Sequence, residues 1–178
     1  MIDPIRIAFE VACPAPHAFE VWTARIDQWW PADHTVSAED GLTIVLERRL
    51  GGRLFARTAD GVAHAWGEVT AWEPPARLAY LWHLRRDRAD ATEVEIRFIE
   101  QGSSTTLVEI EHRGWERLGA EGEGGRDRNP AGWATLLPHY IEATARPCRV
   151  ISGCSRRPGS WSRSRVGPGA SIASTMRA

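Results

Sequence analysis

The stretch that decides the fold is NPAGWATLLPHYIEAT, residues 129–144. Its large apolar side chains recur at i, i+3, i+4, i+7 and i+8, a spacing typical of a helix with one buried face; they are Trp133, Leu136, Leu137, Tyr140 and Ile141. Asn129 followed by Pro130 predicts the N-cap and first residue of this helix. Pro138 removes a backbone donor, which predicts a kink or a restart. Burial of such side chains contributes roughly 1.5–3 kcal/mol each as an upper estimate, so we expect this helix to anchor the core.

The residues before this helix predict a series of strands. Residues 5–11 alternate apolar and polar positions, the pattern of a half-buried strand, and the helical spacing of Phe19, Trp22 and Ile26 then predicts a short helix or a broken pair that ends at Pro31. Six further strands, joined by short turns, are predicted at residues 42–49, 53–58, 62–72, 77–84, 93–100 and 105–113. Residues 119–125, rich in Gly and Glu, indicate a mobile loop. Strands joined in this way form an antiparallel meander.

This order predicts one α+β domain over residues 1–146, in which an antiparallel sheet packs against a long C-terminal helix. From Pro147 onward Ser, Gly, Pro and Arg dominate, which predicts a disordered basic tail over residues 147–178. The abrupt change of composition raises the hypothesis that this tail is a non-native extension.

The charge of the chain is divided between these two parts. All 22 basic residues are Arg, and residues 1–146 hold 16 of them together with all 23 acidic residues, a net charge of −7, whereas the tail carries +6. An acidic domain repels phosphate, so no nucleic-acid partner is expected for the folded part.

Cysteine usage and hydropathy indicate the cellular compartment of the protein. Three cysteines, Cys13, Cys148 and Cys154, make no regular framework, so free thiols are expected rather than disulfides. No apolar run approaches the roughly 18 residues that a membrane span needs, and no secretory signal is visible at the N-terminus. We therefore expect a cytoplasmic protein with no membrane partner.

A series of short motifs runs along residues 3–146. They are Trp29-Trp30-Pro31 with His34, Gly51-Gly52-Arg53, Trp66-Gly67-Glu68-Val69, Trp72-Glu73-Pro74-Pro75-Ala76-Arg77-Leu78, Thr106 to His112 with Gly114-Trp115, and Gly132-Trp133. In order and spacing they resemble the START-like superfamily (SRPBCC), and within it the Aha-like branch, bacterial proteins related to the activator of the heat-shock-protein ATPase. The resemblance implies a helix-grip fold, in which a curved antiparallel sheet is wrapped around the long C-terminal helix and a cavity for an apolar ligand lies between them. Members bind apolar or aromatic small molecules, a few act as cyclases or hydrolases, and others bind chaperone partners.

Five residues are expected on elements around such a cavity and are our candidates for ligand binding: Trp66, Trp82, His112, Trp133 and Leu137. Trp offers a large apolar area and one hydrogen-bond donor, which suits an aromatic ligand. The competing interpretation is that these tryptophans only fill the core. We expect Trp29, Trp30 and His34 to flank the mouth of the cavity, as a lid or as a plug between helix and sheet.

Two residues are weak candidates for catalysis. His112 is in phase with Val108 and Ile110 and should point inward, where it could orient a ligand or act as a general base, although a core histidine satisfied by a neighbour is the alternative. Glu68 is two residues after Trp66 in the same predicted strand, so both side chains should lie on the same face of the sheet. Glu68 is therefore a candidate for an internal carboxylate; the alternative is that this face is solvated. No histidine stands at metal-ligand spacing and no serine lies in a Gly-x-Ser-x-Gly context, so no metal or cofactor is expected.

Three hypotheses for function follow. The first is binding of a small apolar or aromatic molecule between the sheet and the last helix. The second is a chaperone-associated protein-interaction module, which requires a cavity too small for a ligand and a contiguous exposed apolar patch. The third is an enzyme of the cyclase or hydrolase type, which requires His112 and Glu68 inside one cavity.

Overall fold

The computed structural model describes residues 2–35, 41–84 and 86–146. The basic tail predicted for residues 147–178, with Cys148 and Cys154, lies outside the described residues. Cys13 is a buried free thiol.

Seven antiparallel strands form one sheet in the order β1-β7-β6-β5-β4-β3-β2. The strands are β1 (Ile5–Val11), β2 (Thr43–Leu46), β3 (Arg53–Arg57), β4 (Ala63–Glu73), β5 (Arg77–Trp82), β6 (Thr92–Gly102) and β7 (Thr105–Arg113). The meander from β2 to β7 follows the chain, and β1 closes the far edge by pairing with β7, with Ile7 opposite Ile110. The predicted strands are confirmed, because the alternation that revealed them reports on a local backbone geometry.

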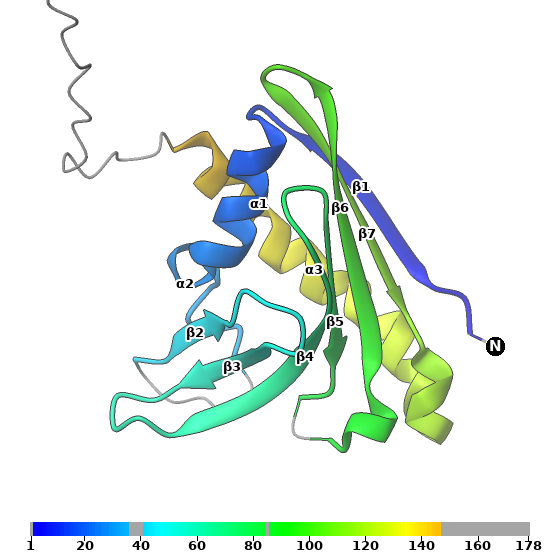
Figure 1. Ribbon diagram of the computed structural model, residues 1–178. Coiled ribbons are helices and arrows are strands. Elements are labelled where there is room, and N and C mark those ends of the chain that lie inside the picture. Colours follow the sequence, from blue (N-terminus) through cyan, green and yellow to red (C-terminus); the bar gives the residue numbers. More distant parts are fainter. Residues whose placement is uncertain (1, 36–40, 85, 147–178) are drawn as a thin grey trace, which may run out of the picture. The chain divides into compact units, whose positions relative to one another are not determined.

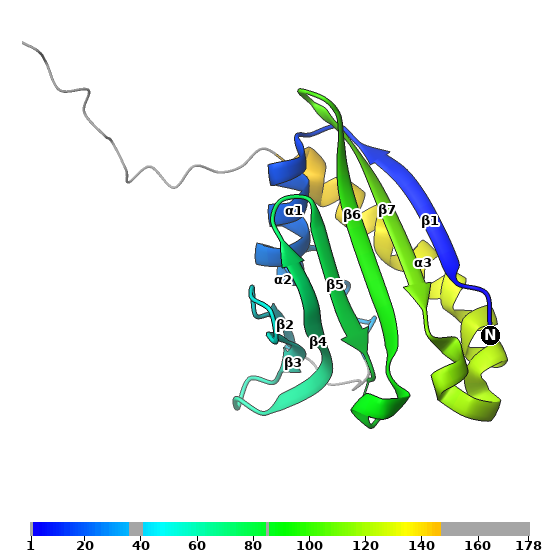
Figure 2. The ribbon, with the colours of Figure 1, turned by 45° about the vertical axis from the view of Figure 1, so that its right-hand side comes forward.

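The sheet curls around the helices, and the longest helix runs along its inner face (Figures 1 and 2). The helices are α1 (Ala15–Ala24), α2 (Ile26–Trp29) and α3 (Gly122–Ala145), with short 3-10 helices η1 (Arg88–Asp90) and η2 (Trp115–Glu121). Helices α1 and α2 are the broken pair that the helical spacing allowed. The predicted α+β helix-grip fold is confirmed.

Helix α3 begins earlier than predicted. It starts at Gly122, so Asn129 is an interior residue and not an N-cap, and the mobile loop predicted at residues 119–125 is instead the end of η2 and the first turn of α3. The reason is a tertiary contact: a Cβ at Gly122 would lie 2.5 Å from the Trp115 carbonyl oxygen, so only glycine lets this turn fold against η2. The helix also continues through Pro138 without a restart. Pro138 is exposed, so the carbonyl group that loses its donor is on the solvent side.

The buried face of α3 also differs in one position from the predicted stripe. Trp133, Leu136, Leu137 and Tyr140 are buried as expected, but Ile141 is 39% exposed and Thr144 takes its place inside. The Tyr140 ring lies 4.6 Å from the Trp22 ring, and its hydroxyl donates to the Ala18 carbonyl oxygen at 2.9 Å. With Tyr140 held in this way, the next buried position of the helix is Thr144, one turn later, and the Ile141 side chain faces solvent.

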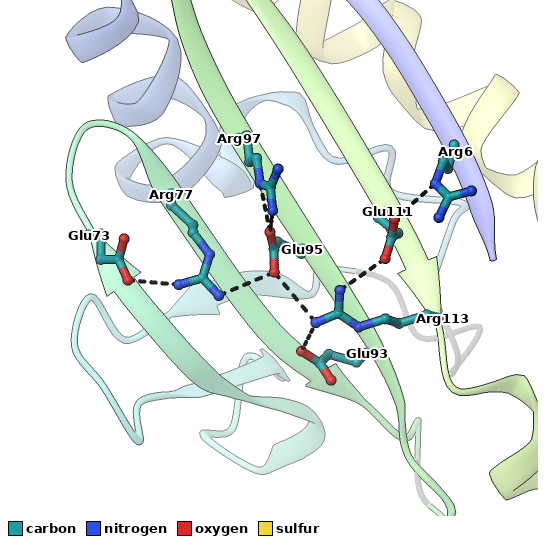
Figure 3. Close-up of polar contacts among 8 residues, drawn as sticks. All are labelled: Arg6, Glu73, Arg77, Glu93, Glu95, Arg97, Glu111 and Arg113. Atoms are coloured by element: carbon teal, nitrogen blue, oxygen red, sulfur yellow. Dashed lines mark hydrogen bonds and ion pairs between the residues drawn. The ribbon is translucent and has the colours of Figure 1, made fainter.

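The outer face of the sheet carries a network of ion pairs (Figure 3). Glu95 on β6 is buried, with Arg77 Nη2 at 3.2 Å and Arg97 Nη2 at 2.7 Å from its carboxylate oxygens. Burial alone raises the pKa of Glu95, but hydrogen bonds from Arg77 and Arg97 outweigh it and hold the pKa below the usual range. Arg97 points outward as well, and this face of the sheet is ionic where the inner face is apolar.

The corrected phase of α3 can be tested with two matched truncations four residues apart. We expect Leu137→Ala to lower the free energy of unfolding by about 2–5 kcal/mol, because it empties a buried site. Ile141→Ala should lower it by less than about 1 kcal/mol, because that side chain already meets water. Urea denaturation followed by tryptophan fluorescence measures both values. Equal losses would contradict a helix phase that buries Leu137 and exposes Ile141.

Candidate ligand-binding site

Strand β4 places Trp66 inside the domain and Glu68 outside. In the ladder with β3, Leu54 pairs with Gly67 but Phe55 pairs with Ala65, so Trp66 is an extra residue in a β-bulge. The bulge shifts the alternation by one residue. Trp66 is therefore 1% exposed and packed inward, whereas the Glu68 carboxylate meets the guanidinium of Arg88 at 3.0 Å on the outer side. The prediction of Glu68 as an internal carboxylate is wrong, since parity holds only along an unbroken ladder.

Gly67 brings β5 close to this bulge. A Cβ at Gly67 would lie 2.1 Å from the Leu81 carbonyl oxygen, so a larger residue cannot occupy the position without moving the backbone. Beyond β5, the backbone N–H groups of His83 and Leu84 both donate to the Trp66 carbonyl oxygen, at 2.8 and 3.2 Å. Leu84 adopts a left-handed conformation with φ of +46°. These contacts fix the backbone of His83 and Leu84, directly after β5, against β4.

A chamber of about 120 Å³ lies between the inner face of the sheet and α3. Its walls are mostly aromatic or aliphatic, with a few polar groups; the lining residues are Trp30, His34, Tyr80, Trp82, Leu84, Val94, His112, Asn129, Gly132, Trp133 and Leu136. Three of the five predicted ligand-binding residues, Trp82, His112 and Trp133, are therefore brought together here. Their role in binding stays a prediction.

The other two candidates lie elsewhere. The Trp66 ring packs behind the chamber, 5.8 Å from the Trp82 ring and 5.4 Å from the Trp30 ring, and it lines an adjoining hollow of about 190 Å³. Leu137 is buried in the core and is not among the residues that line the chamber. Sequence spacing placed Leu137 on the right face of α3 but could not say which buried residues pack solidly and which border a space.

A groove of about 380 Å³ adjoins the chamber. The two spaces share His34, Trp82, Leu84, Asn129 and Gly132, and the groove adds His83, Arg86, Thr92, Trp115, Leu118, Gly125 and Arg128. A cavity of about 150 Å³ holds one benzene ring, and sites for larger ligands span roughly 300–1,000 Å³. A ligand larger than a single ring would therefore occupy the chamber with one end and the groove with the other.

Of the three residues predicted to flank the mouth, Trp30 and His34 line the chamber and Trp29 does not. The Trp30 Nε1–H donates to the His34 carbonyl oxygen at 2.8 Å, which fixes the turn that carries His34. A Cβ at Gly132 would lie 3.8 Å from the His34 ring. Trp29 is 4% exposed and its ring packs on Tyr140, so of the predicted mouth residues Trp29 belongs to the core.

His112 forms the polar floor of the chamber, and both of its ring nitrogens are engaged. Trp133 Nε1 donates to His112 Nδ1 at 3.3 Å, and because an indole can only donate, the neutral imidazole must carry its proton on Nε2. That Nε2 lies 2.8 Å from Thr92 Oγ1, and the Thr92 hydroxyl in turn donates to the Trp82 carbonyl oxygen at 3.2 Å. The network joins β5, β6, β7 and α3 around the chamber.

The protonation of His112 follows from its burial. Desolvation lowers the pKa of His112 to about 3, against a smaller opposing effect of a hydrogen bond with Asn129. The imidazole is therefore neutral at pH 7, and its lone pair on Nδ1 accepts from Trp133. The inward orientation predicted for His112 is confirmed, but the acid–base pair of His112 and Glu68 is excluded, because Glu68 lies on the other side of the sheet.

Tyr80 carries an uncommitted hydroxyl at the chamber. Its side chain is 3% exposed, and burial raises the pKa of this phenol well above its usual value. Within residues 2–35, 41–84 and 86–146, no hydrogen bond joins the Tyr80 hydroxyl to another side chain or to the backbone. Sequence reasoning missed Tyr80, although its position two residues before Trp82 on the same strand was a usable signal.

Other features of the described chain do not compete with this site. A hollow of about 390 Å³ lies on the outer face of the sheet, but it is lined by charged side chains that largely pair with one another, such as Arg6 with Glu111. In the part of the chain that the structure describes, no group of three His, Cys, Asp or Glu residues is arranged to hold a metal ion. None of the described helices combines the length and the hydropathy needed to span a bilayer.

The apolar patch required by the protein-interaction hypothesis is also missing from the described residues. The exposed large apolar side chains lie on four separate segments: Leu50 and Val62 in two turns, Ile99 on β6 and Ile141 on α3. Isolated exposed apolar residues of this kind are normal for a protein surface.

A curled antiparallel sheet that grips a long terminal helix around a lined cavity defines a ligand-binding domain of the START-like (SRPBCC) class. The family model described as Activator of Hsp90 ATPase homolog 1-like protein matches residues 12–146, and the chain belongs to this family. The resemblance inferred from the motifs is thereby confirmed. No curated protein matches the chain.

Solved structures share this fold. An anthrahydroquino-gamma-pyrone synthase, Txn09, solved in a complex, is 28% identical, with 80% of this chain and 97% of that chain covered and a TM-score of 0.57. The self-sacrificing resistance protein CalC from Micromonospora echinospora is 24% identical, with coverage of 79% and 93% and a TM-score of 0.59. Protein MLL2253 from Mesorhizobium loti, at 15% identity, covers 80% and 97% with a TM-score of 0.59.

The burial of His112 predicts a specific response to acid. The pKa of His112 is about 3 in the folded protein and near 6.5 in the unfolded chain. Between about pH 3 and pH 6.5, therefore, His112 is protonated in the unfolded chain but neutral in the folded protein. This contribution to stability is complete above about pH 6.5 and is lost toward low pH, at up to about 1.4 kcal/mol per pH unit.

Urea unfolding of the wild type and of His112→Gln between about pH 6.5 and pH 4.5 tests this expectation. Carboxylates common to both proteins cancel in the difference between the two curves. The difference in the free energy of unfolding should shrink as the pH falls, because only the wild type loses the histidine contribution. Parallel curves would contradict a neutral, buried His112.

Proposed function

We propose that this protein binds a small aromatic molecule, with one ring in the chamber and the rest of the molecule in the groove. The observation that carries the proposal is an unfilled space of about 120 Å³ beneath α3 whose walls include the rings of Trp30, Tyr80, Trp82 and Trp133. A well-packed interior has few voids larger than a water molecule. The space is therefore better explained as a site for a ligand than as part of the core.

The chemistry of the walls favours an aromatic ligand over an aliphatic one. The rings of Trp30 and Tyr80 each lie 6.1 Å from the Trp82 ring, and both pairs are tilted, so an inserted ring can meet both faces and edges. The polar groups are few, as in most sites for small molecules. Of these, the Tyr80 hydroxyl is free to bond a ligand oxygen.

The similar structures support a planar, fused-ring compound as the ligand class. The synthase that is 28% identical to this chain is named for an anthrahydroquinone fused to a pyrone, which is a flat aromatic system. A molecule of that kind exceeds the chamber and would extend into the groove of about 380 Å³. We therefore choose fused-ring aromatic compounds as probes.

Gly132 allows the proposal to be tested without removing a core side chain. It lines both the chamber and the groove, and a Cβ there meets the His34 ring only at the ordinary contact distance of 3.8 Å. The larger side chain of Gly132→Leu should fill the passage between the two spaces while keeping or increasing helix stability. Ala131→Leu, the neighbouring exposed position on the same helix, is the matched control.

We expect anthraquinone carboxamide to quench the tryptophan fluorescence of the wild type and of Ala131→Leu with similar dissociation constants. Gly132→Leu should bind it at least about tenfold more weakly, because one or more ring contacts are lost. Thermal unfolding of all three proteins verifies that they are folded. Absence of quenching in the wild type, or unchanged binding by Gly132→Leu, would count against the proposed site.

A further inference from the structure

Resting on the proposed function, we infer that the ligand is an aromatic acid whose anionic group binds in the groove at Arg128 while its ring occupies the chamber. This names the class of ligand, which neither the fold nor the family specifies. Two independent features of the site lead to it.

The first feature is the sign of the charges around the two spaces. Among the described residues that line the chamber and the groove there is no Asp or Glu, whereas the groove has Arg86 and Arg128 together with His34 and His83. Residues 1–146 as a whole carry a net charge of −7. A cleft lined by one sign of charge within a domain of the opposite sign concentrates ligands of complementary charge. The groove therefore favours an anion.

The second feature is that the two arginines of the groove differ in their partners. The Arg86 guanidinium pairs with the Glu121 carboxylate, so its charge is already balanced. Arg128 forms no direct ion pair or hydrogen bond with another residue of the described ranges, and it acts on Glu121 only at longer range, where it helps to lower the pKa of that carboxyl. The Arg128 guanidinium lies over Gly124, one turn earlier on the same helix. A Cβ added at Gly124 would lie only 3.1 Å from Arg128 Nη1. Arg128 is the free cation of the groove within the described chain.

Arg128 lies at the outer end of the site, whereas Tyr80 lies at the inner end. Arg128 lines the groove only, and Tyr80 lines the chamber only. The spaces therefore match an elongated aromatic molecule with an oxygen substituent at the inserted ring and an ionised acid at the outer end. A charge-assisted bond to Arg128 gives the acid its advantage over a neutral analogue.

The carboxylate and the carboxamide of anthraquinone, substituted at the same ring position, test this inference. They share shape and ring oxygens and differ in charge. We expect the wild-type protein to bind the carboxylate about tenfold more tightly than the carboxamide, as measured by tryptophan quenching. The preference should decrease at high salt, because the groove is open to solvent.

Arg128→Gln should weaken carboxylate binding to about the level of the carboxamide, and it should weaken carboxamide binding by much less. Arg126→Gln is the matched control, because Arg126 is on the same helix, pairs with Asp127 and is not among the residues that line the groove. Equal affinities of the wild type for the two compounds would overturn the anionic class and leave the aromatic site standing. Failure of both compounds to bind would overturn the proposed function as well. A carboxylate preference that survives Arg128→Gln would overturn the assignment of the anion to Arg128.

Discussion

Helix α3 is held against the rest of the domain at two places, and the chamber lies between them. Near its C-terminal end the Tyr140 hydroxyl donates to the Ala18 carbonyl oxygen at 2.9 Å, and the ring packs on Trp22. At the other end Gly122 lies directly against the Trp115 backbone, an approach that any side chain would prevent. Between these contacts Trp133 donates to His112 on β7, and the chamber lies beside that bond. Every functional proposal depends on this space.

The polar groups of the site fall into two kinds. His112 and Thr92 satisfy each other and the neighbouring backbone, so they hold the strands and α3 in register and keep the chamber floor neutral. The Tyr80 hydroxyl has no hydrogen-bond partner among the described residues, and its side chain is 3% exposed and lines the chamber. A polar atom that is fixed but unpaired is costly in the free protein and useful to a ligand. The histidine that first suggested chemistry is therefore a structural group, and less conspicuous residues face the ligand space.

The two faces of the sheet divide stability from binding. On the outer face buried Glu95 is surrounded by arginines, so its charge is compensated and this surface offers little to an apolar ligand (Figure 3). On the inner face aromatic rings border an open space. Antiparallel sheets commonly keep one face wet and one face buried. In this protein the hollow on the outer face is lined mainly by charged side chains, whereas the chamber on the inner face is lined mainly by aromatic and aliphatic ones.

The sequence by itself determined the strands, their antiparallel order, the helix pair and the existence of a long apolar-faced terminal helix, because alternation and helical spacing are properties of a few adjacent residues. The same spacing placed Trp82, His112 and Trp133 on elements around the cavity that the family resemblance implied. Only the tertiary structure decided that α3 begins at Gly122, that Ile141 is outside and that Glu68 faces away from Trp66. A bulge, a backbone contact and the packing of one tyrosine set these features. Each depends on residues distant in the chain. The same is true of Tyr80 and Arg128, which become parts of one site only when β5 and α3 meet.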